Sequence, residues 1–334
     1  MRDINPVLDT AVKAYGFNLS QLVPLTGGHM SHVYRVERDE GSYVMRITPP
    51  NDDIRILDMQ AILHWMQYLA RQGGSVPSPI QSSDHSLIEI IQHHGEQYLV
   101  VVIESASGVL SEEVSIELWH DELYQVLGTT IGKIHQLASQ YTSPNPDLVR
   151  PAWDKSINNF NPQINDDPSL TIIRSKREAL LDHLSKLPME RDSYGLIHGD
   201  LHFGNFFIDI SKNEITIFDF DDCAYGWYMM DIATLLFDIL VVHQGADKGD
   251  LAGIFLLNFL RGYTREKSIS PFWINQMPYF LKLLEIGIYL QVYEDYDSSD
   301  TVSWVGKFMP ARKKRIENDT PYVDINFEEI FSLI

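Results

Sequence analysis

The chain has 334 residues, 44% of them hydrophobic, which is enough for one large domain or for two lobes with cores of their own. Its 26 Lys and Arg against 46 Asp and Glu give a formal net charge of -20, which disfavours nucleic acid and anionic membranes as partners and favours amine-bearing small molecules. The single cysteine, Cys223, excludes an internal disulfide framework, and no apolar run approaches the roughly 20 residues that a membrane helix needs. We therefore expect a cytoplasmic protein.

The N-terminal part of the chain predicts a short helix followed by an antiparallel sheet. Asn5-Pro6 begins the helix, which runs over 7–15 and ends at Gly16. A second helix over 54–71 follows Asp53, a residue type that caps helices. Alternating or continuous apolar residues predict strands over 21–25, 31–37, 42–48, 87–91 and 98–103.

Two features of this sheet suit a bound anion. The paired glycines Gly27-Gly28 separate the first two strands, and glycine lets backbone N–H groups approach a phosphate closely. In the third strand Arg46 lies between Met45 and Ile47, so its side chain is expected on the opposite face of the strand. The alternatives for these two features are a plain tight turn and an exposed edge arginine.

The apolar pattern changes after the last of these strands. Glu104–Gly108 interrupts it, and we place a hinge between two lobes there. From Ser111 onward the periodicity is helical, apart from a long loop over 144–167 that is rich in Pro and Asn. His135 lies beside the apolar stripe of the helix that follows Ser111, and we expect it to be a hydrogen-bonded core residue. Further helices are expected over 174–187, 231–242, 250–262 and 272–293.

Two apolar runs near the middle of the chain predict a short hairpin. The runs are Asn205–Ile210 and Ile215–Phe218, and the polar residues around Lys212 form the turn. This pairing sets Asn205 beside Asp219 at the open end of the hairpin. One cation could contact both side chains there.

The loop that enters this end of the hairpin carries a further carboxylate, Asp200. Mg²⁺ takes hard oxygen ligands and bridges nucleotide phosphates, while a separate Asp positions the attacking hydroxyl and accepts its proton. The sequence H-G-D-L-H-F-G-N over 198–205, followed by F-D-F-D-D-C over 218–223, resembles the catalytic segment of the aminoglycoside phosphotransferase and choline kinase family. That family has the protein-kinase-like fold.

The resemblance implies an α+β fold of two lobes. A small N-terminal antiparallel-sheet lobe over 1–104 would bind nucleotide, and a larger, mostly helical C-terminal lobe over 105–334 would hold the catalytic and acceptor sites. The catalytic motif and R-P-A-W-D over 150–154 are closest to the homoserine kinase type II and bacterial stress-response kinase branch. The implied activity is transfer of the γ-phosphate of ATP, with Mg²⁺, to a hydroxyl of a small, amine-bearing molecule.

Individual roles also follow from the resemblance. Asp200 is implied to orient the acceptor hydroxyl and accept its proton, and Asn205 and Asp219 are implied to hold Mg²⁺. Asp231 is expected to cap its helix and is implied to brace the catalytic loop. The residues implied to bind ATP, the last two through their main chain, are Gly27, Gly28, Ser31, Arg46, Glu104 and Ala106.

One family feature is missing from the sequence. The helix over 54–71 should supply a Glu that pairs with the strand cation, but its only acid is Asp58, and the expected position holds Ile62. A nucleotide-binding pseudokinase is therefore one alternative function. A Ser/Thr protein kinase of the bacterial stress-response type is another, because the net acidity would also suit a basic protein substrate.

Other acidic residues near the motifs leave further alternatives open. The H-x-D-x-H pattern of His198, Asp200 and His202 is also compatible with a metal-dependent hydrolase. Asp221 and Asp222 could support a metal or be solvated. In the resembled family the C-terminal helices and the loops between them form the acceptor pocket, so the candidates for contacting an amine are Glu285, Tyr289, Glu294 and Asp295.

Overall fold

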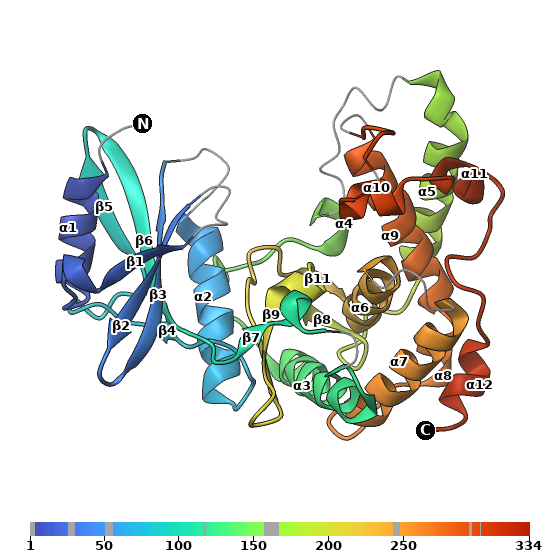
Figure 1. Cartoon of the computed structure of the whole chain (residues 1–334), viewed down its shortest axis with the longest axis horizontal. Coiled ribbons are helices and arrows are strands. Elements are labelled where there is room, and N and C mark those ends of the chain that lie inside the picture. The colour runs from blue at the N-terminus through green and yellow to red at the C-terminus, as the bar shows by residue number, and fades with distance from the viewer. Residues whose placement is uncertain are drawn as a thin grey trace. The chain divides into compact units, whose positions relative to one another are not determined.

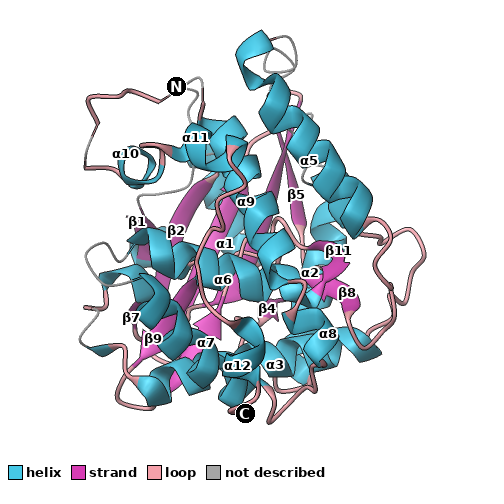
Figure 2. Ribbon diagram, turned by 90° about the vertical axis from the view of Figure 1, so that its right-hand side faces the viewer, coloured by secondary structure: helices cyan, strands magenta, loops and turns pink. Residues whose placement is uncertain are grey.

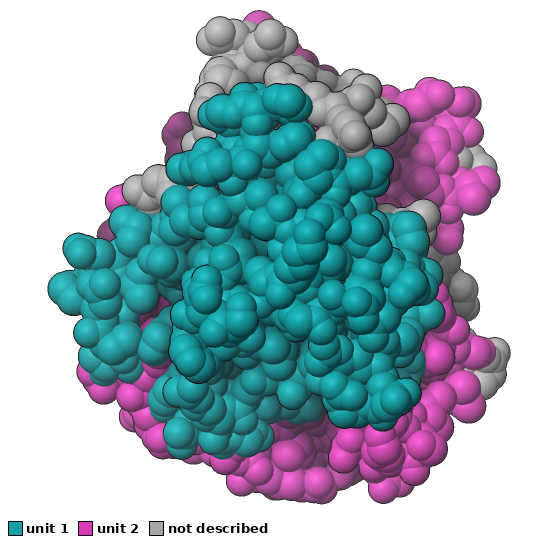
Figure 3. All heavy atoms as spheres, turned by 90° about the vertical axis from the view of Figure 1, so that its left-hand side faces the viewer, with its two compact units in different colours: residues 1–108, 142–150, 216–221 teal, residues 109–141, 151–215, 222–334 magenta. Residues whose placement is uncertain are grey.

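The computed structural model divides the chain into two compact units, which we describe one at a time (Figure 3). Unit 1 comprises Met1–Gly108, Thr142–Arg150 and Thr216–Asp221, and unit 2 comprises Val109–Tyr141, Pro151–Ile215 and Asp222–Ile334. The structure describes residues 4–25, 31–50, 56–115, 118–156, 167–242, 248–293, 296–300 and 302–334. The predicted domain boundary after Glu104 stays a prediction.

A six-stranded sheet forms the centre of unit 1 (Figures 1 and 2). The main strand order is β1-β2-β3-β6-β4, and β5 also pairs with β6. These neighbouring pairs are antiparallel. The strands are β1 (Leu22–Leu25), β2 (His32–Arg38), β3 (Gly41–Thr48), β4 (Pro79–Ile80), β5 (Glu89–His93) and β6 (Glu96–Glu104).

Two helices cover opposite faces of this sheet (Figure 1). Helix α1 (Asn5–Ala14) packs on the face that carries Met45, while α2 (Ile56–Arg71) packs on the face that carries Val101. The register pairs Arg46 with Val101. Because directly paired residues of an antiparallel sheet share a face, Arg46 lies on the face that α2 covers.

Helices make up most of unit 2 (Figure 1). The longer ones are α3 (Asp121–Gln140), α5 (Thr171–Leu184), α6 (Tyr228–Val242), α7 (Lys248–Tyr263) and α9 (Met277–Val292). The short ones are α4 (Trp153–Ser156), α8 (Pro271–Ile274), α10 (Trp304–Phe308), α11 (Arg312–Glu317) and α12 (Phe327–Phe331). Among the described residues, no helix is long and apolar enough to cross a membrane.

Small sheets lie beside these helices. One has the order β10-β9-β7, and the other pairs β11 with β8 in antiparallel fashion. Their strands are β7 (Val109–Leu110), β8 (Tyr194–Ile197), β9 (Phe206–Asp209), β10 (Glu214–Ile217) and β11 (Ala224–Trp227). Short 3₁₀ helices are η1 (Leu19–Gln21), η2 (Ser111–Glu113), η5 (Pro168–Leu170) and η6 (Phe203–Asn205).

Helices α3 and α7 approach each other closely through glycine. A Cβ atom on Gly128 would lie 1.9 Å from the carbonyl oxygen of Phe259, and one on Gly132 would lie 2.7 Å from that of Tyr263. Neither position can hold a side chain without moving the partner backbone. Glycine therefore sets the spacing of these two helices.

The predicted fold class is confirmed, and most predicted strands and helices are found to within a few residues at their ends. Two predictions differ, because the helix expected over 272–293 is divided into α8 and α9, and the short helix α4 lies within the loop expected over 144–167. Several short strands were not predicted, among them β4, β7 and β11. Residues 224–227 form β11, so α6 begins at Tyr228 rather than near Asp231, and residues 109–110 form β7. Both are short strands paired with distant segments, Val109 with Ile208 and Ala224 with Ile197. Local periodicity does not detect such pairing.

Candidate active site

The loop between β8 and η6 carries the predicted catalytic residue Asp200. The loop leaves the sheet after Ile197, and its apolar residues Leu201 and Phe203 are 0% and 2% exposed. Asp200 lies between these anchors, with about half of its side chain exposed. The buried neighbours fix the loop, while the Asp200 carboxylate stays accessible. A residue that contacts substrate needs both properties.

Neighbouring side chains hold one oxygen of the Asp200 carboxylate. The amide Nδ2 of Asn205 donates to the Asp200 main-chain oxygen (2.8 Å) and to its Oδ2 (3.2 Å). His202 Nε2 lies 3.5 Å from the same Oδ2. Within the part of the chain that the structure describes, Oδ1 of Asp200 accepts no hydrogen bond. One oxygen is thus fixed, and the other is available to a hydroxyl.

The charges around Asp200 favour its ionised form. Its partial burial would by itself raise the pKa of the carboxyl, but the hydrogen bond and charge of His202, with smaller contributions from His198 and Asn205, hold that pKa below its ordinary value. Burial likewise would lower the pKa of His202, but Asp200, Asp238 and Glu112 raise it. Asp200 is therefore a carboxylate at neutral pH, as a proton acceptor must be.

Asp231 in the first turn of α6 braces the start of this loop. Its Oδ2 accepts from the N–H of His198 (2.8 Å), and its Oδ1 accepts from the N–H of Gly199 (3.1 Å). Burial would raise the pKa of Asp231, but the hydrogen bond from His135 and the donation from His198 hold it below its usual range. The predicted bracing role of Asp231 matches these contacts.

His135 on α3 forms a hydrogen bond with the Asp231 carboxylate. Its Nε2 lies 3.1 Å from Asp231 Oδ2, and its Nδ1 lies 3.0 Å from the hydroxyl of Tyr263 on α7. Burial lowers the pKa of His135 and raises that of Tyr263. These partners assign a neutral ring that donates from Nε2 to Asp231 and accepts at Nδ1 from Tyr263. The expectation of a hydrogen-bonded core histidine is confirmed.

A second acid of α6, Asp238, was missed by the sequence analysis. The N–H of Phe203 donates to Asp238 Oδ2 (2.8 Å), so Asp238 and Asp231 hold opposite ends of the loop. The two acids are two helical turns apart and lie on one face of α6. The available signal was an Asp in a helix that is otherwise almost entirely apolar.

Gly199 is required by the shape of the loop. Its φ is +85°, in the left-handed region, and a Cβ atom there would lie 2.3 Å from the carbonyl oxygen of Asp222. The His198 ring accepts from the N–H of Asp200 at Nδ1 (3.3 Å). The H-G-D sequence thus builds the turn that exposes Asp200.

The two predicted magnesium ligands belong to different units, so their shared metal stays a prediction. Asn205 commits its Nδ2 to Asp200, and its Oδ1 accepts no hydrogen bond from any residue that the structure describes. Asp219 has a left-handed backbone with φ +64°. An amide oxygen and a carboxylate are hard donors of the kind that Mg²⁺ prefers, so these residues fit the ion.

The predicted nucleotide-binding residues lie in unit 1. Arg46 forms an ion pair with Asp221, and Ser31 Oγ lies 3.0 Å from Thr48 Oγ1. The N–H of Glu104 already donates to Ser78 O (2.9 Å), so its carbonyl is the group left for an adenine. The Ala106 N–H makes no hydrogen bond with the described residues. Gly27 and Gly28 lie outside the residues that the structure describes.

The hydrolase alternative lacks a suitable cluster of ligands. The described ranges contain no group of three or more His, Cys, Asp or Glu side chains that could hold a metal ion. His198 and His202 each use Nδ1 to accept from a main-chain N–H, that of Asp200 and of Gly204 respectively. These side chains shape the loop instead of converging on a metal.

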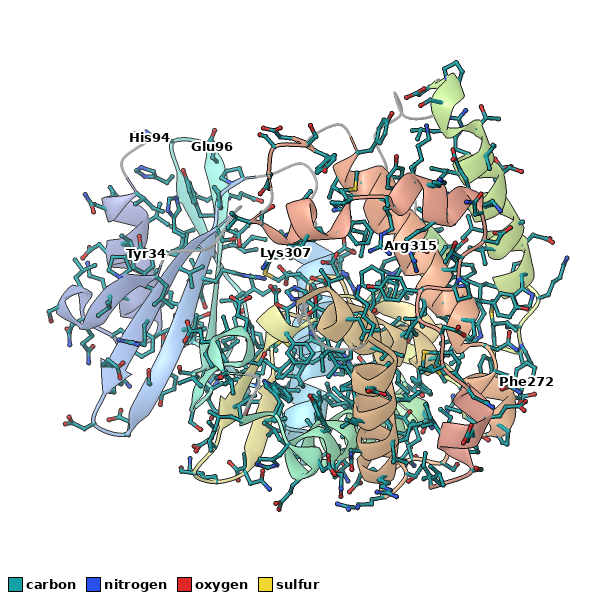
Figure 4. The ribbon with its side chains drawn as sticks, turned by 45° about the vertical axis from the view of Figure 1, so that its right-hand side comes forward. Tyr34, His94, Glu96, Phe272, Lys307 and Arg315 are labelled. Carbon is teal, nitrogen blue, oxygen red and sulfur yellow. The ribbon has the colours of Figure 1, made fainter. Side chains whose placement is uncertain are left out.

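The expectation that Glu285 meets an acceptor is wrong. Its carboxylate is 0% exposed and is bound by Arg312 Nη1 (2.7 Å) and Lys282 Nζ (2.5 Å). Arg312 belongs to α11, the helix marked by Arg315 in Figure 4. Tyr289 is also buried, at 3% exposure, and the acceptor candidates Glu294 and Asp295 lie outside the described residues. A buried charge needs such partners, so Glu285 joins α9 to α11.

Comparisons with known proteins show which proteins this chain is similar to. The family model described as "Phosphotransferase enzyme family" matches residues 21–267. Amicoumacin kinase of Bacillus subtilis (strain 168) is 30% identical over 328 residues, which cover 97% of this chain and 95% of that protein. Among solved structures, amicoumacin kinase hAmiN in complex with AMP-PNP, Ca²⁺ and Ami has a TM-score of 0.86 at 29% identity, covering 98% of this chain and 97% of that one.

A microcompartment-associated aminopropanol kinase shares the fold, with a TM-score of 0.73 at 20% identity over 95% of this chain and 98% of that chain. The family match extends over most of the chain and includes both predicted catalytic motifs. The resemblance to the aminoglycoside phosphotransferase family and the kinase activity that it implied are confirmed. The chain belongs to the phosphotransferase enzyme family.

Proposed function

We propose that this chain transfers the γ-phosphate of ATP to a hydroxyl of a small molecule, with amicoumacin as the first candidate acceptor and amine-bearing molecules as the wider class. Support for the acceptor comes from the similarity to two amicoumacin kinases. The formal net charge of -20 also favours cationic acceptors over anionic ones.

The observation that carries the proposal is the asymmetric setting of Asp200, whose Oδ2 is held by Asn205 and His202 while Oδ1 is open. An acceptor hydroxyl bound to Oδ1 is oriented for in-line attack and gives its proton to the carboxylate. A bond forms from the acceptor oxygen to the γ-phosphorus. The bond from that phosphorus to the β,γ-bridging oxygen breaks, and its electrons leave with ADP.

Other residues would bind the nucleotide. Asn205 Oδ1 and the Asp219 carboxylate would hold Mg²⁺, which supplies charge neutralisation at the phosphates. Arg46 would contact the phosphates, for which its planar guanidinium offers two parallel N–H donors. The Glu104 carbonyl and the Ala106 N–H would face the adenine edge.

The test is a transfer assay with Mg-ATP and a panel of acceptors that includes amicoumacin, amino alcohols, amino sugars and a generic basic protein. We expect mass spectrometry to detect one added phosphoryl group on amicoumacin. Asp200→Asn, which keeps the shape of the side chain but not its basicity, should lower kcat by about 10²–10⁴-fold while Mg-ATP binding is retained.

Three outcomes would contradict the proposal in different ways. Unchanged turnover by Asp200→Asn would remove the base assignment. Transfer to the protein but to no small molecule would replace the acceptor class with a protein substrate. Lack of Mg-ATP binding by the wild-type chain would remove the nucleotide from the proposal altogether.

A further inference from the structure

Arg46 has an acidic partner that the sequence analysis did not identify. Its Nη1 lies 2.7 Å from Asp221 Oδ2, and the two side chains are 27% and 49% exposed. Asp221 is 175 positions away along the chain, two residues beyond the predicted metal ligand Asp219. Both members of the ion pair belong to unit 1, so the contact lies within one compact body.

Helix α2 covers the face of the sheet that holds Arg46, yet it supplies no acid to it. The position expected to carry Glu is Ile62, which is 6% exposed and packed in the core. Among the residues that the structure describes, Asp221 is the acid within ion-pair distance of Arg46. The counter-charge for the strand cation therefore comes from the segment that follows β10.

That segment is held firmly at both ends within unit 1. The N–H of Ile217 donates to the main-chain oxygen of Ser75 (3.0 Å), just beyond α2. At the other end, Arg150 Nη2 donates to the main-chain oxygen of Asp221 (2.6 Å). Phe220 between them is 1% exposed. The main chain at Asp221 is thus held in place, and the Asp221 carboxylate can order the flexible side chain of Arg46.

We propose that Asp221 is the positioning residue for the phosphate-binding Arg46, taking the place of the missing helix glutamate. This inference rests on the proposed nucleotide-binding function. An ordered arginine loses less conformational freedom when it binds a phosphate, so the ion pair raises affinity by preorganisation. The same short segment then has two roles. Its Asp221 positions the phosphate-binding Arg46, and its Asp219 supplies a carboxylate to the metal ion.

The ion pair is partly exposed, and such pairs contribute little to folding stability. Breaking it should therefore change nucleotide binding without unfolding the protein. We expect Asp221→Ala to weaken Mg-ATP binding, measured by titration calorimetry, by about tenfold, and to raise the KM for ATP by a similar factor. The KM for the acceptor should stay within about twofold.

Matched variants separate positioning from other roles. Asp221→Glu keeps the charge and should restore most of the lost affinity. Arg46→Ala and the double variant Arg46→Ala/Asp221→Ala should bind Mg-ATP equally weakly, because each removes the same interaction. The control is Glu37→Ala, which removes the partner of Arg35 on the adjacent strand (2.8 Å) and should leave Mg-ATP binding unchanged.

Several results would overturn the inference. If Asp221→Ala binds Mg-ATP as well as the wild type, or more tightly, Asp221 does not prepare Arg46 and instead has no effect or competes with phosphate. If the variant mainly raises the Mg²⁺ concentration needed for half-maximal activity, Asp221 is a metal ligand. If the wild type itself binds no nucleotide, the proposed function fails first, and this inference fails with it.

Discussion

The loop of unit 2 that carries Asp200 and the side chain of Arg46 in unit 1 are held by acids in opposite ways. Asp231, which braces the loop, has a side chain only 2% exposed and accepts from main-chain and ring N–H groups. Asp221, which holds Arg46, is 49% exposed. A buried anion fixes the geometry of its partners, and removing it lowers the free energy of unfolding strongly. Breaking an exposed ion pair lowers it little.

This difference suits the two proposed tasks, proton acceptance by Asp200 and phosphate binding by Arg46. A proton acceptor must sit within a few tenths of an ångström of its working position, because small displacements lower the rate sharply. A phosphate-binding side chain must instead engage and release a nucleotide in every turnover. We therefore expect the buried acids to control the stability of the protein and the exposed ion pair to control ligand binding.

The largest effect on stability is expected from Asp231→Ala. The substitution leaves the N–H groups of His198 and Gly199 and the ring of His135 without their buried acceptor. We expect the free energy of unfolding to fall by about 3–5 kcal/mol, measured by urea denaturation, with loss of transfer activity. A loss under about 1 kcal/mol would mean that the loop does not depend on this buried anion.

A smaller effect is expected from Asp238→Asn, because the amide oxygen can still accept from the N–H of Phe203. Burial raises the pKa of Asp238, so the folded protein holds this proton more tightly than the unfolded chain does. The wild type therefore loses stability as pH rises from the ordinary Asp value through the raised one.

Asp238→Asn removes that titration. We expect the stability of the variant relative to the wild type to increase as the pH rises above the ordinary Asp pKa of about 4, measured by urea denaturation at each pH. The opposite slope would show that Asp238 is held in its ionised form, as Asp231 is. Glu40→Gln, at an exposed acid of unit 1, serves as the control for the general effect of removing a carboxylate.

The smallest effect on stability is expected from Arg46→Ala. Its ion pair is partly exposed, so the free energy of unfolding should change by less than about 1 kcal/mol. Mg-ATP should nevertheless raise the melting temperature of this variant less than that of the wild type, because a phosphate contact is lost. Equal shifts for both proteins would make Arg46 a surface residue and would remove the contrast between the two regions.

Much of the site could be predicted because its signals are local. The residues from His198 to Asn205 are contiguous, and strand alternation placed Arg46 opposite Met45 and Ile47. Both inferences need only neighbouring residues and the period of a strand. The fold class followed from the family resemblance that these motifs carry, and the order of apolar patterns, first strand-like and then helical, agrees with it.

What could not be predicted depends on contacts between distant parts of the chain. The partner of Arg46 comes from a segment 175 positions away, and the burial of Glu285 depends on Arg312 in a different helix. The acidic residue in α9 looked like a surface group because a helical pattern gives no information about which helix covers it. Asp238 was overlooked for the same reason, since its partner Phe203 lies in another element.

The glycine contact between α3 and α7 has a consequence for how this sequence can vary over evolution. Gly132 lies one turn before His135 on α3 and faces Tyr263 at the end of α7, the residue whose hydroxyl meets the histidine ring. A larger residue at Gly132 would spread the two helices and separate that ring from that hydroxyl. Substitution at Gly132 is thereby constrained by the hydrogen bonds that support the loop, and these bonds limit how far the two helices can shift relative to each other.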